Sequence, residues 1–64
     1  MEKSVLIYDG DRLVMELVVI EDKNGTQFAI KKGNTRRIIS RKEFFMYIDI
    51  ARYTGHNVFD YTDF

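Results

Sequence analysis

The stretch "DKNGTQFAIKKGNT", residues 22–35, holds a short β-rich run between two turn signals. Asn24-Gly25 suits a type I′ turn because both residues tolerate positive φ, and Gly33-Asn34 suits a type II′ or I′ turn. A run bounded by two such turns pairs antiparallel with the segments before and after it. The stretch therefore predicts the middle of an antiparallel meander, with one strand at 26–32.

The same pattern continues on both sides of this strand. A third turn signal, "DGDR" at 9–12, separates two further apolar runs, and a β-rich run also follows Gly33-Asn34. Turn signals at regular spacing between such runs are typical of hairpin-connected strands. The predicted strands are 4–8, 12–21, 26–32 and 35–39.

Side chains alternate between the two faces of a strand, so counting outward from the turns assigns each residue to a face. The predicted first face carries Leu6, Tyr8, Leu13, Met15, Leu17, Val19, Phe28, Ile30 and Ile39. The predicted second face carries Val5, Ile7, Val14, Glu16, Val18, Ile20, Ala29, Lys31, Arg36 and Ile38.

A helix follows the last strand. Ser40 and Glu43 form an S-x-x-E capping box, and Gly55 supplies a helix stop. The residues between them repeat with the spacing of a buried stripe that would lie on the first sheet face, namely Phe44, Tyr47, Ile48 and Ala51. Residues 56–64 form either a fifth strand or an aromatic tail. The fold class is α+β in a single domain, 1–64, with a small SH3-like or OB-like barrel carrying one helix as the alternative.

The second sheet face keeps more apolar side chains than a solvated face normally shows. A contiguous apolar patch of this kind usually marks an interaction site. The candidates that would cover it are a second copy of the chain, a different protein, or the folded-back tail. The tail residues concerned are Val58, Phe59, Tyr61 and Phe64.

Catalysis is not indicated by any motif in the chain. The sequence has no cysteine and a single histidine, His56, so it lacks a thiol nucleophile and a metal-ligand cluster with suitable spacing. The acidic pairs Asp9/Asp11 and Glu21/Asp22 lie at turns, where Asp is favoured for local backbone hydrogen bonds. We therefore expect no enzyme, cofactor or metal. We also expect neither a membrane span nor a signal peptide, and a cytoplasmic protein.

Basic residues concentrate in "IKKGNTRRIISRKEFF", residues 30–45, although the whole chain has ten Lys and Arg and ten Asp and Glu. The predicted register places Lys31 directly opposite Arg36, a like-charge pair that destabilises a sheet unless an acid or anion relieves it. Glu16, predicted to lie diagonally from this pair, relieves it in part. Lys32, Arg37, Arg41 and Lys42 have no evident acidic neighbour.

The sequence thus favours a small binding module, a stoichiometric regulator or inhibitor of the kind phages and mobile elements encode. Its expected partner is another protein with an acidic patch, or a second copy in a homodimer. The alternative is a nucleic-acid-binding regulator that uses the basic residues 31–42 against phosphates. The candidate partner-binding residues are Lys31, Lys32, Arg36, Arg37, Arg41, Lys42, Phe45, Val18, Phe59 and Tyr61.

Overall fold

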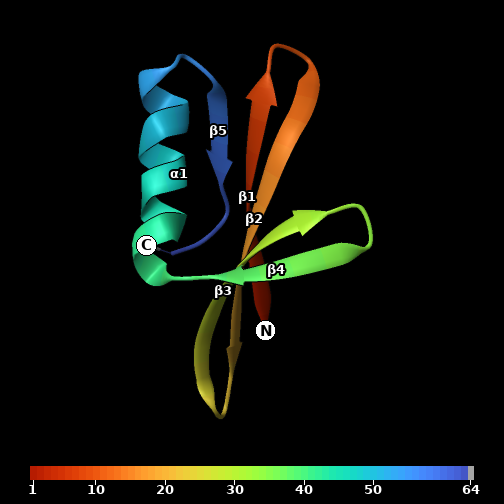
Figure 1. Ribbon diagram of the computed structural model, residues 1–64, viewed down its shortest axis with the longest axis vertical. Coiled ribbons are helices and arrows are strands. Elements are labelled where there is room, and N and C mark those ends of the chain that lie inside the picture. Colours follow the sequence, from red (N-terminus) through yellow and green to blue (C-terminus); the bar gives the residue numbers. More distant parts are fainter. Residues whose placement is uncertain (64) are drawn as a thin grey trace.

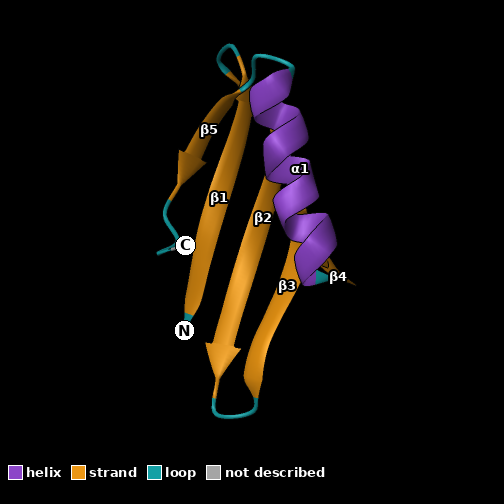
Figure 2. Ribbon diagram, turned by 90° about the vertical axis from the view of Figure 1, so that its left-hand side faces the viewer, coloured by secondary structure: helices purple, strands orange, loops and turns teal. Residues whose placement is uncertain are grey.

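The computed structural model describes residues 1–63 and contains one five-stranded antiparallel sheet with one helix on one of its faces (Figures 1 and 2). The strand order is β4-β3-β2-β1-β5. The elements are β1 (Glu2–Asp9), β2 (Arg12–Asp22), β3 (Gly25–Lys32), β4 (Thr35–Ile39), α1 (Arg41–Tyr53) and β5 (Asn57–Asp60). This confirms the predicted α+β meander. The sheet is open, with β4 and β5 at its edges, so the barrel alternative does not hold.

The turn between β2 and β3 differs from the predicted one. Asp22 pairs with Gly25, so the two-residue loop is 23–24. Gly25, which directly follows the loop, is the only residue of this turn with positive φ. The carboxylate of Asp22 accepts a hydrogen bond from the Asn24 backbone N–H at 2.7 Å, a local bond that Asp commonly makes in turns. The β2–β3 register shifts by two residues, which leaves the facing of both strands unchanged.

The predicted facing of β1 is wrong. Val5 and Ile7, expected on the second face, are buried under the helix at 0% and 2% exposure, whereas Leu6 and Tyr8 point to the opposite face. We call the helix-covered side of the sheet the inner face and the opposite side the outer face.

An irregularity in β2 explains this reversal. Tyr8 pairs with Leu13 and Ile7 pairs with Met15, which leaves Val14 as an extra residue without a β1 partner. A bulge of one residue reverses the facing of everything beyond it, because side chains alternate with period two. Leu13 consequently lies on the outer face with Tyr8, and not on the inner face as predicted.

The helix begins and ends as predicted. Ser40 Oγ accepts a hydrogen bond from the Glu43 N–H, and the Glu43 carboxylate accepts one from the Ser40 N–H, both at 3.0 Å. Gly55 follows the helix with φ +82°, and the next N–H, of His56, donates to the Ala51 carbonyl at 2.9 Å. Such a left-handed residue after a helix is commonly glycine because it has no Cβ to clash.

The core lies between α1 and the inner face. Phe44 is fully buried, and its ring centroid lies 4.9 Å from that of Phe28 in β3. Of the predicted helix stripe, Phe44, Ile48 and Ala51 are buried and Tyr47 is half-buried. The buried residues of this core are Val5, Ile7, Leu17, Val19, Phe28, Ile39, Phe44, Ile48 and Ala51.

As far as residue 63, the segment after the helix extends the sheet and does not cover the outer face. β5 pairs antiparallel with β1, and beyond its end the Tyr61 N–H donates to the Ser4 carbonyl at 3.0 Å. Val58 packs against the core on the inner face, whereas Phe59 and Tyr61 remain 48% and 63% exposed. Phe64, the last residue proposed to fold back, lies outside the described residues.

The sheet curls toward its outer face. Val18 and Ala29 lie on that face, yet both are fully buried. In a flat sheet β1 and β4 would lie about 14 Å apart, three strand spacings. The guanidinium of Arg36 in β4 nevertheless lies 2.7 Å from the carboxylate of Glu2 in β1. Curvature therefore brings the edge of the sheet back over its own outer face.

Candidate binding cleft

The two hairpins of the sheet diverge at one end. The β2–β3 pairing ends at Glu16 opposite Lys31, and from there β2 runs on beside β1 only while β3 runs on beside β4 (Figure 1). The Val14 bulge lies just beyond this point. Because bulges increase the local twist of a strand, it helps the two hairpins to diverge. The opening between the hairpins is a cleft of about 500 Å³.

Four cations and an apolar floor line this opening, which we call the basic cleft. The cations come from β3 and β4, and they are Lys31, Lys32, Arg36 and Arg37. The apolar part comes from β2, β3 and the helix, and it consists of Val14, Met15, Ile30 and Tyr47. The β3–β4 turn brings the cations together, because two residues on each side of it belong to this set.

The predicted like-charge pair is present and is relieved by acids on both sides. Lys31 lies opposite Arg36 on one side and directly opposite Glu16 on the other. The Glu16 carboxylate also accepts a hydrogen bond from Ser4 Oγ at 3.2 Å. On the far side, Arg36 forms its ion pair with Glu2. Both cations of the pair therefore have a carboxylate nearby on the outer face.

The other two cations of the cleft are less compensated. The Lys32 side chain makes no ion pair or hydrogen bond within residues 1–63. Arg37 lies opposite Ile30, on the inner face, close enough to Glu43 to act on that carboxylate. The pKa of Glu43 is lowered first by its hydrogen bonds with the Ser40 backbone and side chain, and then by the positive charge of Arg37. The cleft is therefore net positive.

The remaining basic candidates lie outside the cleft. The Arg41 guanidinium lies over the rings of Phe28 and Phe45, 6.0 and 5.4 Å from their centroids, where cation–π attraction holds it. Phe45 is half-buried and packs against the core, with its ring edge-on to Phe44 at 5.2 Å. Lys42 is exposed on the first turn of α1.

The apolar candidates divide in the same way. Val18 has no exposed surface and cannot contact a partner in this conformation. Phe59 and Tyr61 are exposed, but they line a different hollow at the β1–β5 edge. Sequence reasoning missed Val14, Met15 and Tyr47 as cleft residues. The signal that could have indicated the bulge is the unbroken apolar run from Leu13 to Met15, which violates strand alternation.

Chemically, the basic cleft is equipped to bind an anionic group next to an apolar one. Within residues 1–63, no three His, Cys, Asp or Glu side chains gather closely enough to hold a metal ion. None of the helical segments in that part of the chain is long and apolar enough to cross a membrane. No family model, curated protein or solved structure matches this chain.

Proposed function

We propose that this protein is a small non-enzymatic binding module that regulates or inhibits another cytoplasmic protein by stoichiometric association. The basic cleft takes an extended acidic segment of that partner. One observation carries the proposal: four cations, from both faces of the β3–β4 hairpin, line an opening that has an apolar floor. A solvated charge run would spread its cations over convex surface.

The cleft also supplies an unpaired strand edge. Arg12, Leu13 and Met15 of β2 pair with β1, but they and the bulged Val14 have no β3 partner within the described chain. An extended segment that adds to such an edge gains main-chain hydrogen bonds, and its alternate side chains reach pockets on either side. The nearby cations would steer an acidic segment to this edge and act mainly on association rate and specificity.

A protein partner is favoured over nucleic acid by the charge of the whole chain and by the small aromatic surface of the cleft. The chain as a whole carries no net charge, whereas nucleic-acid-binding domains are usually strongly basic. Among the described residues, Tyr47 is the only aromatic side chain that lines the cleft, which gives little surface for base stacking.

The test is affinity capture from the native lysate with charge-matched variants. Lys32→Ala/Arg37→Ala removes two cleft cations, and Lys23→Ala/Arg52→Ala removes two exposed cations elsewhere, so both variants have the same net charge. We expect wild type and the control to retain the same protein, identified by mass spectrometry, and the cleft variant to lose it. Nuclease treatment should leave the result unchanged.

Three outcomes would contradict the proposal. Equal loss of the partner in both double variants would show that net charge matters and the cleft does not. Capture of nucleic acid would instead support phosphate binding by all four cations if the slope of log K against log salt concentration were about −4. A homodimer would appear as a concentration-dependent mass in sedimentation, abolished by the cleft variant alone.

A further inference from the structure

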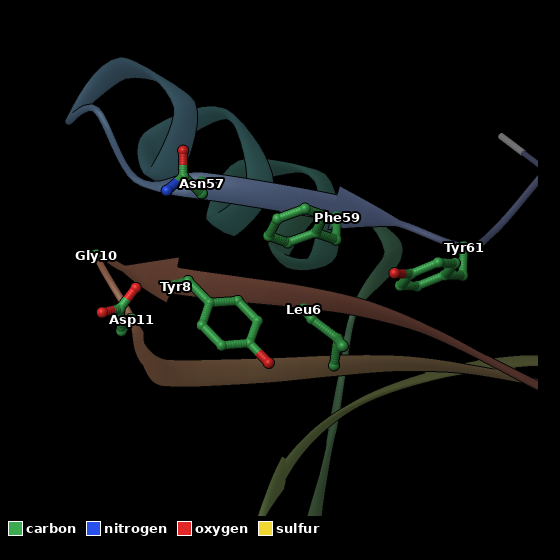
Figure 3. A pocket seen from close by; sticks show the side chains of 7 residues that line it. All are labelled: Leu6, Tyr8, Gly10, Asp11, Asn57, Phe59 and Tyr61. Atoms are coloured by element: carbon green, nitrogen blue, oxygen red, sulfur yellow. The ribbon is translucent and has the colours of Figure 1, made fainter.

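A second hollow, which we call the aromatic groove, lies on the outer face at the opposite side of the sheet from the β3–β4 hairpin. It has a volume of about 430 Å³. Figure 3 shows side chains from β1, β5 and the β1–β2 turn around it. Those used below are Leu6, Tyr8, Asp11, Asn57, Phe59 and Tyr61. The groove shares no residue with the basic cleft, so the inference below does not depend on the proposed function.

Strand pairing sets the spacing of the groove side chains. Asn57, Phe59 and Tyr61 are every second residue of an extended segment, so they lie on the same face. The strand register places Leu6 opposite Phe59 and Tyr8 opposite Asn57. Two residues along a strand rise about 6.6 Å, so the row from Asn57 to Tyr61 spans about 13 Å. One turn of a polyproline II helix rises about 9 Å, so the row is long enough for slightly more than one turn.

The aromatic walls are held in place before any ligand arrives. The Tyr8 and Phe59 rings meet edge-to-face, at 89° and a centroid separation of 5.6 Å. The backbone of Tyr61 is fixed by its hydrogen bond to β1, and the next residues are fixed by an Asp60 carboxylate that accepts the Thr62 N–H at 2.8 Å. An ion pair between Lys3 and Asp63 ties the following turn to β1. Preorganised walls reduce the ordering cost of binding.

The polar groups of the groove have no partner inside the described chain. The side chains of Tyr8, Asn57 and Tyr61 make no hydrogen bond within residues 1–63. A polyproline II segment has no internal hydrogen bonds and exposes its carbonyls, so it supplies the acceptors that these hydroxyl and amide donors lack. Aromatic-lined grooves are the common receptor for such segments.

The charge at the groove selects the ligand further. Asp11 lies at one end, beside Gly10 in the β1–β2 turn, and among residues 1–63 no Lys or Arg side chain lines the groove. A phosphate backbone would meet this carboxylate without any compensating cation. A ligand with a positive charge at that end would instead gain an ion pair.

We propose that the aromatic groove binds a proline-rich segment of another protein in the polyproline II conformation, with a basic residue beside the prolines that faces Asp11. Proline rings pack against Tyr8, Phe59 and Tyr61, and the tyrosine hydroxyls donate to the carbonyls of the segment. The basic residue fixes the direction in which the segment lies.

The test uses the full chain and a synthetic peptide in which one arginine is followed by three Pro-Leu-Pro units, titrated by NMR. We expect shifts at Leu6, Tyr8 and Phe59. Tyr61→Ala should weaken binding about tenfold or more, the size typical of an aromatic hot spot. The control is Tyr53→Ala, which removes a tyrosine that is 92% exposed on the helix and should bind like wild type.

Two further variants separate the contacts. Tyr61→Phe keeps the ring and removes the hydroxyl, so binding should lie between those of wild type and Tyr61→Ala. Asp11→Lys should weaken the arginine peptide and strengthen a peptide with glutamate in its place, with Asp49→Lys as the exposed control on the helix. Amide dispersion of each variant reports that the fold is retained.

The proposal fails if the proline peptide does not shift the groove residues, or if Tyr61→Ala and Tyr53→Ala bind equally. It also fails if the same peptide with alanine at every proline binds as well. Tighter binding of a single-stranded oligothymidine at Tyr8 and Phe59 would assign the groove to nucleic-acid stacking and overturn the peptide proposal.

Discussion

The carboxylate of Glu2 reaches the guanidinium of Arg36 across two intervening strands, at 2.7 Å. This contact joins the start of β1 to the start of β4, next to the β3–β4 turn, so it reports the curl of the sheet directly. It also reduces the positive charge of the basic cleft, because Arg36 is one of the four cations that line it. The pair therefore links the shape of the sheet to the charge of the cleft.

Glu2→Gln should leave stability almost unchanged and strengthen the basic cleft. Both side chains are more than a third exposed, and exposed ion pairs contribute about 0–1 kcal/mol. The freed guanidinium should raise the association rate with a glutamate-rich peptide at low salt, measured by stopped flow. Asp49→Asn removes one exposed negative charge on the helix and is the matched control. Equal acceleration by the control would contradict the local effect.

Deletion of Val14 should regularise the β1–β2 pairing and narrow the basic cleft. The deletion keeps Tyr8 opposite Leu13 and Ile7 opposite Met15, so we expect stability to change by no more than about 2 kcal/mol. Without the bulge β2 should twist less, and the hairpins should diverge less. Urea unfolding measures the first effect and titration of a glutamate-rich peptide the second. Unchanged peptide affinity would show that the bulge does not shape the cleft.

Ser40→Ala should destabilise the protein by about 1 kcal/mol, measured by urea unfolding, because it removes the hydroxyl that caps the helix. A change of a few tenths of a kcal/mol or less would show that the remaining contacts hold the first turn. Ser40→Asp, which keeps a side-chain oxygen that can accept the Glu43 N–H, should recover most of the lost stability and so separates loss of the cap from other effects of the substitution.

Glu43→Gln should make stability less dependent on pH. The amide can still accept the hydrogen bond from the Ser40 N–H. It lacks, however, the ionisable carboxyl group whose pKa is lowered in the folded state. A lowered folded-state pKa stabilises the protein above the unfolded-state pKa, and this stabilisation is lost as pH falls through the folded-state value. The advantage of wild type over Glu43→Gln should thus shrink on acidification. An advantage independent of pH would contradict the charge argument.

Phe44→Ala should unfold most of the population, whereas Phe45→Ala should leave the protein folded. Phe44 is fully buried, and truncation of a buried Phe costs about 3–5 kcal/mol, comparable to the whole stability of a domain this small. Phe45 is only half-buried and loses less contact surface. Amide dispersion and urea unfolding distinguish the two. A folded Phe44→Ala would show that the core is larger than one helix and one sheet face.

The elements of this fold were predictable because their local signals are independent of the rest of the chain. The Ser40–Glu43 capping box and the Gly55 stop depend on a few neighbouring residues. The pairing of Lys31 with Arg36 follows from a two-residue turn by counting. These features gave the meander, the helix bounds and most of the β2, β3 and β4 facing.

The features that sequence reasoning missed depend on longer-range geometry. One extra residue at Val14 reversed the facing of all of β1, since a counting argument carries any single error to the end of the strand. The Asn24 turn was misplaced because the Asp22 carboxylate stabilises a loop one residue earlier. Of the candidate site, the cations were found and the apolar floor was not, because Tyr47 joins it only through tertiary packing.

The basic cleft and the aromatic groove can form at different stages of synthesis. The basic cleft needs β2, β3, β4 and the helix, all neighbours along the chain, whereas the aromatic groove needs Leu6 to meet Phe59. During synthesis, the groove must therefore wait until β5 has left the ribosome. A chain shortened by proteolysis or truncation after Gly55 would retain the residues of the cleft while losing one wall of the groove. Cutting this short segment would therefore separate the two proposed binding sites, which the intact chain holds together.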